Sequence, residues 1–223
     1  MRVDEMTLRR RQEQNLAAPR PDTRAITPSI RNFAQAIDRQ RQTVEHVPLL
    51  IAGKPGLIDV ARALDEAEVA ALAIAVDARE ELSSLSAAAA AISVPVLRCD
   101  LLLEEFQVYE SRAAGADAVL LHARLLPGAQ LARLCGAARS THMAACVACD
   151  TAAEIQRAAT ARAAAVALAR ADEELFAAVP RRLLVLALDP AAAVLGRVDA
   201  LLDESIGAAS DPAGAFRATL EGS

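Results

Sequence analysis

The chain has 223 residues, of which 54% are hydrophobic and 2% aromatic, and it contains no tryptophan. Its formal net charge of −5, without a basic stretch interleaved with aromatic residues, argues against nucleic-acid binding. Charges and turn residues interrupt each apolar run before it reaches the roughly 18 residues that a membrane span needs. With four cysteines and no recognisable signal peptide, the sequence predicts a cytoplasmic protein whose core is built from Ala, Leu, Val and Ile.

The first 46 residues form a polar prefix and predict a helical extension. A helix is expected over residues 4–17. Three prolines between residues 19 and 28 then interrupt the chain, because proline cannot continue a helix interior. A second short helix is expected over residues 32–40, where Phe33 and Ile37 share one face.

From residue 47 onward, apolar runs alternate with amphipathic segments. The apolar runs fall at residues 48–52, 70–76, 94–98, 117–122, 143–148, 163–168, 183–188 and 198–202. The amphipathic segments fall at 57–67, 79–92, 104–114, 128–140, 151–161, 172–178 and 211–221, and a weaker one at 190–196. Continuous apolar runs suit parallel strands that are covered on both faces. The pattern predicts an α/β fold, a single-domain (β/α)8 TIM barrel over residues 47–223, preceded by the N-terminal helical extension of residues 1–46. An open doubly wound sheet is the rival, but no strand is followed by a G-x-G-x-x-G turn.

A stretch near the middle of the chain carries a family resemblance. It reads Val96-Leu97-Arg98-Cys99-Asp100, continues through an amphipathic segment to Gly115-Ala116-Asp117, and ends in the apolar residues 118–121. This strand, helix, turn and strand resemble the third to fourth strands of indole-3-glycerol-phosphate synthase, the ring-closing enzyme of tryptophan biosynthesis. The resemblance covers residues 30–221 and is strongest at 94–121. It implies a lyase without a cofactor, which closes an indole ring from a phosphorylated anilino-ribulose carboxylate with loss of carbon dioxide and water.

The residues that the resemblance implies as catalytic are only partly present. In the family the third strand ends Leu-Arg-Lys-Asp and the lysine is the general acid, whereas this chain has Cys99 in that place. Lys54 matches the family lysine at the end of the first strand if one residue is deleted. The two family glutamates fall on Gly53 and Val147, which cannot transfer a proton. Lys54 and Cys99 are therefore the candidate catalytic residues.

A second group of residues lies where the family binds its substrate. The candidates are Arg98, Asp100, Ser83, Ser84 and Arg170. In the family, backbone N–H groups at the turn after the eighth strand hold the phosphate with help from the helix dipole. Here that turn reads Asp203-Glu204-Ser205. Each contact between like charges at about 4 Å would cost on the order of 4 kcal/mol at an effective dielectric near 20.

Cysteine and histidine spacing leaves a metal site as an alternative. Cys146 and Cys149 form a C-x-x-C motif, but they lie in an expected strand, where residues i and i+3 point to opposite faces. Cys99, His122 and Cys149 fall near the expected barrel mouth and would offer zinc a Cys2His set. Two buried thiols and a surface imidazole are the simpler interpretation, so no metal is expected. The acidic residues at the expected strand ends, which make the mouth acidic, are interpreted as helix caps and solvated rim charges. The alternative is an oxygen-ligand metal site or recognition of a cationic partner.

Three hypotheses for function follow. The first is a divergent homologue of the synthase that lacks its catalytic and phosphate-binding residues and has no synthase activity. The second is an active lyase that acts on the family substrate or a relative of it through Lys54 and Cys99. The third is a metal-binding barrel. A partner would be a small anionic aromatic substrate or another protein, and neither nucleic acid nor a membrane is expected.

Overall fold

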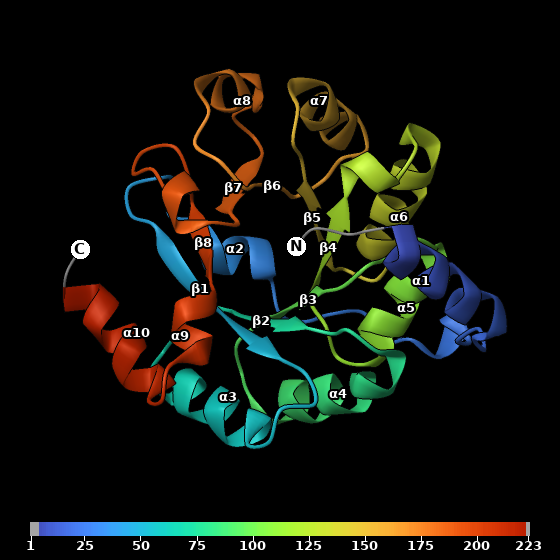
Figure 1. The fold of residues 1–223 in the computed structure, drawn as a ribbon, viewed down its shortest axis with the longest axis horizontal. Helices are drawn as coiled ribbons and strands as arrows, with labels where there is room; N and C mark the ends of the chain where they lie inside the picture. The colour runs from blue at the N-terminus through green and yellow to red at the C-terminus, as the bar shows by residue number, and fades with distance from the viewer. Residues whose placement is uncertain (1–4, 222–223) are drawn as a thin grey trace.

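Figure 1 shows a ring of strands surrounded by helices; the computed structural model describes residues 5–221, apart from the side chains of Glu5 and Met6. The strands form a closed barrel in chain order, from β1 to β8 and back to β1, and all pairs are parallel. They are β1 (Glu45–Ile51), β2 (Leu72–Ala75), β3 (Val96–Cys99), β4 (Ala118–His122), β5 (Ala144–Ala148), β6 (Ala165–Leu168), β7 (Leu184–Ala187) and β8 (Ala200–Asp203). The predicted (β/α)8 barrel is confirmed.

Helices alternate with the strands and form the outer layer. The α-helices are α1 (Glu5–Ala17), α2 (Phe33–Ile37), α3 (Leu57–Glu66), α4 (Leu82–Ala91), α5 (Glu105–Ala113), α6 (Gly128–Ser140), α7 (Ala152–Thr160), α8 (Glu173–Ala178), α9 (Glu204–Ala208) and α10 (Pro212–Glu221). Short 3-10 turns are η1 (Thr23–Ala25), η2 (Arg79–Glu81), η3 (Ala123–Leu125) and η4 (Pro190–Ala192). Apolar residues at helical spacing explain the longer helices: α6, for example, buries Leu131, Leu134 and Ala138 against the barrel.

Side chains along each strand alternate between the barrel interior and the layer under the helices. The inward-facing residues form what we call the interior cluster. Its buried members are Phe33, Ile37, Val47, Ala71, Ala73, Leu97, Ala118, Leu120, Cys146, Ala165, Ala167, Leu186, Ala200 and Leu202. The residues between them, such as Val119 and Val166, pack under the helices in a second, larger cluster. This alternation decides which residue at each strand end faces the mouth of the barrel.

Helix α2 closes the amino-terminal end of the barrel. Phe33 and Ile37 belong to the interior cluster and are almost fully buried, and α2 crosses the centre of the ring in Figure 1. Arg31, just before α2, holds the segment in place. Its Nε lies 2.7 Å from Oδ2 of Asp117, which directly precedes β4, and its guanidinium donates to three backbone carbonyl oxygens. The extension thus contributes directly to the barrel core.

The structure differs from the expected boundaries in a few places. Strand β1 begins at Glu45, ahead of the expected domain boundary at residue 47, and the division into an extension and a barrel stays a prediction. Helix α9 was not expected, and the weak segment at 190–196 contains only the turn η4. The expected helix start at Asp4 lies outside the described residues. Among the helices of residues 5–221, none has the length and apolar character that crossing a membrane requires.

Candidate functional site

The carboxyl ends of the strands form the mouth of the barrel, which is where reacting residues project in barrels of this kind. The strand alternation identifies the residue of β1 to β7 that faces inward nearest the mouth. These residues are Ile51, Ala75, Cys99, His122 and Ala148, and, directly after β6 and β7 on the same alternation, Ala169 and Leu188. Of this set, only Cys99 and His122 have a side chain that can exchange a proton.

A pocket of about 500 Å³ opens on the side of the mouth formed by β1, β2, α3 and α9, and we call it the mouth pocket. It is lined by Leu49, Leu50, Ile51, Lys54, Pro55, Leu57, Val60, Ala75, Asp77, Glu204, Gly207 and Ala208. Lys54 is exposed and lies on its wall, where it could contact a ligand. A catalytic role of Lys54 stays a prediction.

Cys99 faces the mouth from the end of β3 and packs against the interior cluster. Burial, followed by the neighbouring Cys146, Asp100 and Glu204, raises the pKa of its thiol far above the ordinary value. At pH 7 the side chain is therefore a neutral thiol. It carries no cation to orient a carboxylate, and it holds its proton too tightly to serve as an efficient general acid near neutral pH.

Val147 does not face the mouth, so it cannot mark the place of a reacting glutamate. It packs under the helices in the outer cluster, whereas its neighbour Ala148 packs against the interior cluster. A shift of one residue along a strand moves a side chain to the opposite face. The inward-facing position near the end of β5 is therefore Ala148, which, like valine, can neither accept nor donate a proton.

His122 is buried, which corrects the expectation of a surface imidazole. Its side chain lies at the end of β4, the residue is 8% exposed, and its Nε2 has no hydrogen-bond partner among the described residues. Burial, followed by the nearby charge of Arg124, lowers the pKa of the imidazole to about 4, and Asp150 and Asp100 oppose this shift only in part. The imidazole is neutral at pH 7 and places a polar but uncharged group inside the barrel.

Cys149 lies on the opposite face of its strand from Ala148, away from the barrel interior. It packs under the helices, its Sγ donates to the carbonyl oxygen of Val147, and burial raises the pKa of its thiol to about 12. In the part of the chain that the structure describes, no group of three or more His, Cys, Asp and Glu side chains is arranged to hold a metal ion. The candidate set of Cys99, His122 and Cys149 is therefore not assembled in these residues.

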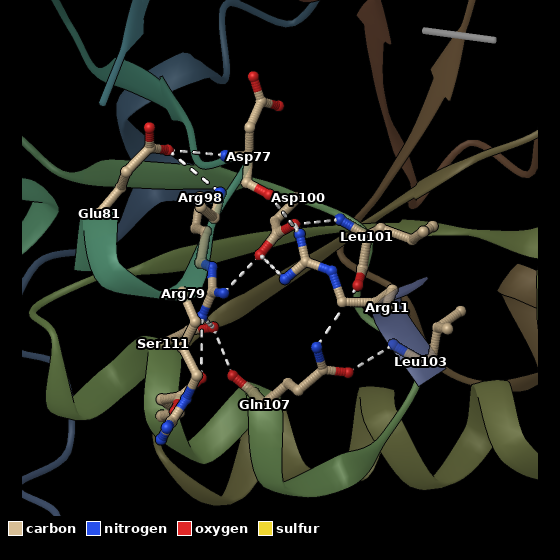
Figure 2. Close-up of polar contacts among 12 residues, drawn as sticks. Arg11, Asp77, Arg79, Glu81, Arg98, Asp100, Leu101, Leu103, Gln107 and Ser111 are labelled. Carbon is tan, nitrogen blue, oxygen red and sulfur yellow. Dashed lines mark hydrogen bonds and ion pairs between the residues drawn. The ribbon is translucent and has the colours of Figure 1, made fainter. Parts of the chain in front are cut away.

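Arg98 and Asp100 lie on the outer face of β3, within the buried ionic network that Figure 2 shows. Arg98 is fully buried, its Nη2 lies 2.5 Å from Oδ2 of Asp100, and its Nη1 donates to Oγ of Ser111 at 3.0 Å. Glu110, 3.9 Å from Arg98, also pairs with Arg79. These partners favour a structural role for Arg98 and Asp100, and their contact with a substrate stays a prediction.

Arg11 of α1 completes this network and was not expected from the sequence. Its Nη2 lies 2.7 Å from Oδ1 of Asp100 and donates to the main-chain carbonyl oxygen of Asp77 at 3.0 Å (Figure 2). One helical turn later, Asn15 donates to Oε1 of Gln107 at 3.1 Å. Arg11 and Asn15 are four residues apart and so share a face. That spacing of two polar residues is the only sequence signal that could have indicated their burial.

The remaining substrate-binding candidates lie outside the mouth pocket. Ser83 and Ser84, in the first turn of α4, line a separate cleft of about 560 Å³ between α3 and α4. Lys54 lines this cleft as well as the mouth pocket. Arg170 is exposed after β6, and its Nη2 donates to the carbonyl oxygen of Asp150 at 2.9 Å. Their roles in binding stay predictions.

Glu81 brings a carboxylate next to Gly53, a contact that the sequence did not indicate. Its Oε2 accepts from the backbone N–H groups of Asp77 and Ala78 at 3.0 and 3.2 Å. Its Oε1 lies 3.0 Å from the place that a Cβ of Gly53 would occupy. Gly53 also has a φ of +75°, which favours glycine. The glycine therefore leaves the space into which the Glu81 carboxylate fits.

Comparison with known proteins gives these positions a family context. The family model described as indole-3-glycerol phosphate synthase matches residues 4–172, which is most of the chain. The chain belongs to the indole-3-glycerol phosphate synthase family.

Individual synthases match shorter segments. The indole-3-glycerol phosphate synthase of Albidiferax ferrireducens is 43% identical over 103 residues, which cover 45% of this chain and 39% of that protein. The synthase of Desulfosudis oleivorans is 44% identical over 85 residues, which cover 37% of this chain and 32% of that protein. The chain therefore spans less than half the length of these curated relatives.

Solved structures with lower sequence identity share the fold. Orotidine 5'-phosphate decarboxylase from Pyrococcus horikoshii aligns with a TM-score of 0.63 at 13% identity, over 77% of this chain and 96% of that chain. Thiamine phosphate pyrophosphorylase from Pyrococcus furiosus aligns with a TM-score of 0.60 at 15% identity, over 82% of this chain and 98% of that chain. At these identities the similarity shows the fold alone.

The match to the synthase family ends at residue 172, so β7, β8 and their loops lie beyond it. In (β/α)8 barrels the loops after the seventh and eighth strands frequently bind phosphate. In this chain an aspartate occupies the backbone amides after β6, β7 and β8. Asp172 accepts from the N–H groups of Glu174 and Leu175, Asp189 from that of Ala191, and Asp203 from those of Ser205 and Ile206.

Asp203 therefore caps α9, and its side chain does not face the barrel mouth. It is buried on the outer face of β8, where its Oδ2 lies 2.8 Å from Nδ1 of His46. Burial opposes ionisation, but hydrogen bonds from Ser205, His46 and the backbone of Ile206 outweigh it and lower the pKa of Asp203. The expected capping role is thus confirmed for this aspartate, and the amides that it occupies are closed to an external anion.

Proposed function

We propose that this member of the synthase family keeps the barrel of its relatives but does not close the indole ring. The observation that supports the proposal is the set of side chains that face the barrel mouth. From β5 to β7 the inward-facing residues are Ala148, Ala169 and Leu188, none of which can move a proton. Ring closure with loss of water and carbon dioxide needs positioned acids and bases.

The state of Cys99 supports the same conclusion. Its thiol stands where the resemblance places the catalytic lysine, and burial keeps the thiol neutral by raising its pKa. Loss of a single preorganised donor costs roughly 2.7–4 kcal/mol in transition-state stabilisation. Loss of several such groups would leave a rate that is hard to distinguish from the uncatalysed reaction.

The loops after β6, β7 and β8 support the loss of phosphate binding. A phosphate held there would need free backbone N–H groups. Asp172, Asp189 and Asp203 occupy amides in these three loops with their own carboxylates. A dianion would have to displace each carboxylate and also meet its repulsion.

The decisive experiment is a turnover assay with the anilino-ribulose phosphate carboxylate that synthases use. Because the chain has no tryptophan, indole fluorescence of the product can be followed with little protein background. We expect no indole product above the level seen with Cys99→Ala and Lys54→Ala. Turnover above the uncatalysed rate would overturn the proposal, and its loss in both variants would assign the activity to Lys54 and Cys99. A parallel measurement of melting temperature with inorganic phosphate should show no stabilisation, since only a ligand that binds the folded state raises it.

An active lyase remains the second candidate, and family membership is the observation that favours it. Lys54 lies on the mouth pocket and Cys99 faces the mouth, so both could reach a ligand there. This candidate requires the turnover described above, on the family substrate or an unphosphorylated relative. The metal-binding alternative requires stoichiometric metal in the purified protein, which elemental analysis would reveal. A cytoplasmic location, and association with another protein, stay predictions.

A further inference from the structure

The mouth pocket has mostly apolar walls, and part of that apolar surface is exposed to solvent. Leu49, Ile51 and Ala75 line it from β1 and β2. Ile51 is 46% exposed although it points into the mouth. An exposed large apolar side chain inside a concave site is typical of ligand pockets. This observation is independent of the charges around the pocket.

Two carboxylates and one ammonium group also line the mouth pocket. Asp77 and Glu204 are exposed, and neither forms an ion pair with the residues that the structure describes. Figure 2 shows the carboxylate of Asp77 directed away from Arg11, which binds only the main-chain carbonyl oxygen of Asp77. Glu204 is the first residue of α9, directly after β8, and it contributes to the raised pKa of the Cys99 thiol at the mouth. Lys54 is the only basic residue among the residues that line the pocket.

The local charge balance favours a cation over an anion. Lys54 also borders the cleft between α3 and α4, so its flexible side chain has a second place in which to lie. Glu81 adds a third carboxylate beside Gly53, next to Lys54 in the chain. The amides at the start of α9 are occupied by Asp203, so they provide no compensating anion site.

We propose that the mouth pocket binds an apolar primary amine, whose ammonium group is held by Asp77 and Glu204 while its apolar body packs against Ile51 and Ala75. This inference rests on the proposed function, because a mouth that still bound a phosphorylated carboxylic acid would need the opposite charge. It replaces the anionic ligand expected from the family resemblance with a cationic one.

The test compares three ligands that share one aromatic body. Tryptamine carries an ammonium group, indole-3-propionate carries a carboxylate on a chain of the same length, and 3-methylindole is neutral. Because the protein has no tryptophan, the fluorescence anisotropy of each indole reports binding directly. We expect tryptamine to bind more tightly than 3-methylindole, indole-3-propionate to bind most weakly, and the tryptamine affinity to fall as salt increases.

Matched variants assign the contacts. Asp77→Asn and Glu204→Gln should each weaken tryptamine roughly threefold to tenfold and leave 3-methylindole unchanged. Glu66→Gln, at an exposed site on α3 outside the pocket, removes the same charge and should change nothing. Ala75→Leu should weaken both ligands by filling the pocket.

Three results would overturn the inference: no tryptamine binding at millimolar concentration, equal or tighter binding of indole-3-propionate, or an affinity that both carboxylate variants leave unchanged. The turnover assay is a separate readout. Absent tryptamine binding together with absent turnover would refute this inference and leave the proposed function standing. Turnover of the phosphorylated substrate would refute the proposed function whatever the amine does.

Discussion

His122 shows how burial alone can fix the charge of a residue inside the barrel. An imidazole on the surface would be partly protonated near pH 6.5, whereas the buried one has a pKa lowered to about 4. Cys99, in the same mouth, is shifted in the opposite direction, because a thiol ionises to an anion. Both groups are therefore neutral at pH 7, and the charge of the mouth comes from exposed residues at its rim.

The depressed pKa of His122 predicts a pH-dependent stability. Between about pH 6.5 and pH 4 the unfolded chain binds a proton at this histidine that the folded chain does not, so the stability is present above pH 6.5 and is lost on acidification. We expect the free energy of unfolding to fall by up to about 3 kcal/mol over this range because of this group. His122→Leu should flatten the dependence. Urea unfolding at a series of pH values measures it, and an unchanged slope in the variant would contradict the prediction.

The lowered pKa of Asp203 predicts that the free energy of unfolding also falls on acidification, but at lower pH. Its pKa is lowered in the folded protein, so its contribution is complete above the unfolded value near 3.9 and is lost as the pH falls through the folded value. Loss of the cap of α9 in Asp203→Ala should lower the free energy of unfolding by about 1–2 kcal/mol at pH 7. The difference from the unchanged protein should shrink at pH 3.

The control for this measurement is the neighbouring Glu204→Gln, which removes an exposed carboxylate that has no ion pair among the described residues. It should change the stability by no more than about 0.5 kcal/mol. If both variants lose equal stability, the cap is not the cause.

At the scale of elements, α1 is attached to the barrel mainly through polar groups. Arg11 and Asn15 are its only buried residues among those whose side chains are described, and Leu16 is 83% exposed. Little apolar area is therefore buried along this helix, and the ion pair with Asp100 is its main anchor. A helix docked in this way separates from its neighbours more easily than one held by a hydrophobic face.

Substitution of Arg11 should release α1 without unfolding the barrel. In Arg11→Met, Asp100 keeps its partner Arg98, so the barrel side of the network stays paired. We expect hydrogen exchange of the α1 amides to increase at least tenfold, while exchange in β3 and β4 stays unchanged. Arg10→Met, at an exposed position of the same helix, should leave exchange as it was. A uniform increase across the barrel would show that Arg11 stabilises the whole fold instead.

The elements differ in how well the sequence predicted them. Strands buried on both faces appear as apolar runs, and helix α6 was predicted with the bounds that it has, Gly128–Ser140. Helix α9 has only five residues, ESIGA, too few to show a helical period, so it was missed. The face of a residue is harder to predict than its element. One residue of register separates Val147 from Ala148 and reverses which of them faces the mouth.

The candidate site was predicted less completely than the fold. The structure places Lys54 on the mouth pocket and Cys99 at the end of β3, and their catalytic role stays a prediction. The partners of Asp100 could not be foreseen, since Arg11 is 89 residues away in the chain. Contacts of that kind depend on how α1 packs, and a sequence pattern carries no information about that packing.

At the scale of the whole molecule, helix α2 of the chain's own N-terminal segment closes the amino-terminal end of the barrel. Phe33 and Ile37 fill the interior next to alanines, which are too small to occupy the space themselves. Arg31 ties the same segment to Asp117. The expected extension therefore has two parts with different roles: α1 is attached by polar contacts, whereas Phe33 and Ile37 of α2 belong to the core.

Two truncations test this division. Removal of residues 1–28 should leave a barrel that unfolds cooperatively, because Arg31, Phe33 and Ile37 remain. Removal of residues 1–43 should abolish cooperative unfolding. Loss of Phe33 and Ile37 costs roughly 2–5 kcal/mol each, against a typical total of about 5–15 kcal/mol. Thermal unfolding followed by circular dichroism distinguishes the two truncated chains. A cooperative transition in the shorter one would show that the barrel folds without α2.

The aspartates after β6, β7 and β8 limit how this barrel can respond to dissolved anions. The backbone holds each carboxylate next to these amides at an effective concentration on the order of millimolar or above. A free sulfate or phosphate must therefore compete with that carboxylate for the same N–H groups. Replacement of Asp203 by glycine would remove the carboxylate to which the amides of Ser205 and Ile206 now donate. The barrel should therefore respond little to the sulfate or phosphate of a buffer at these three loops.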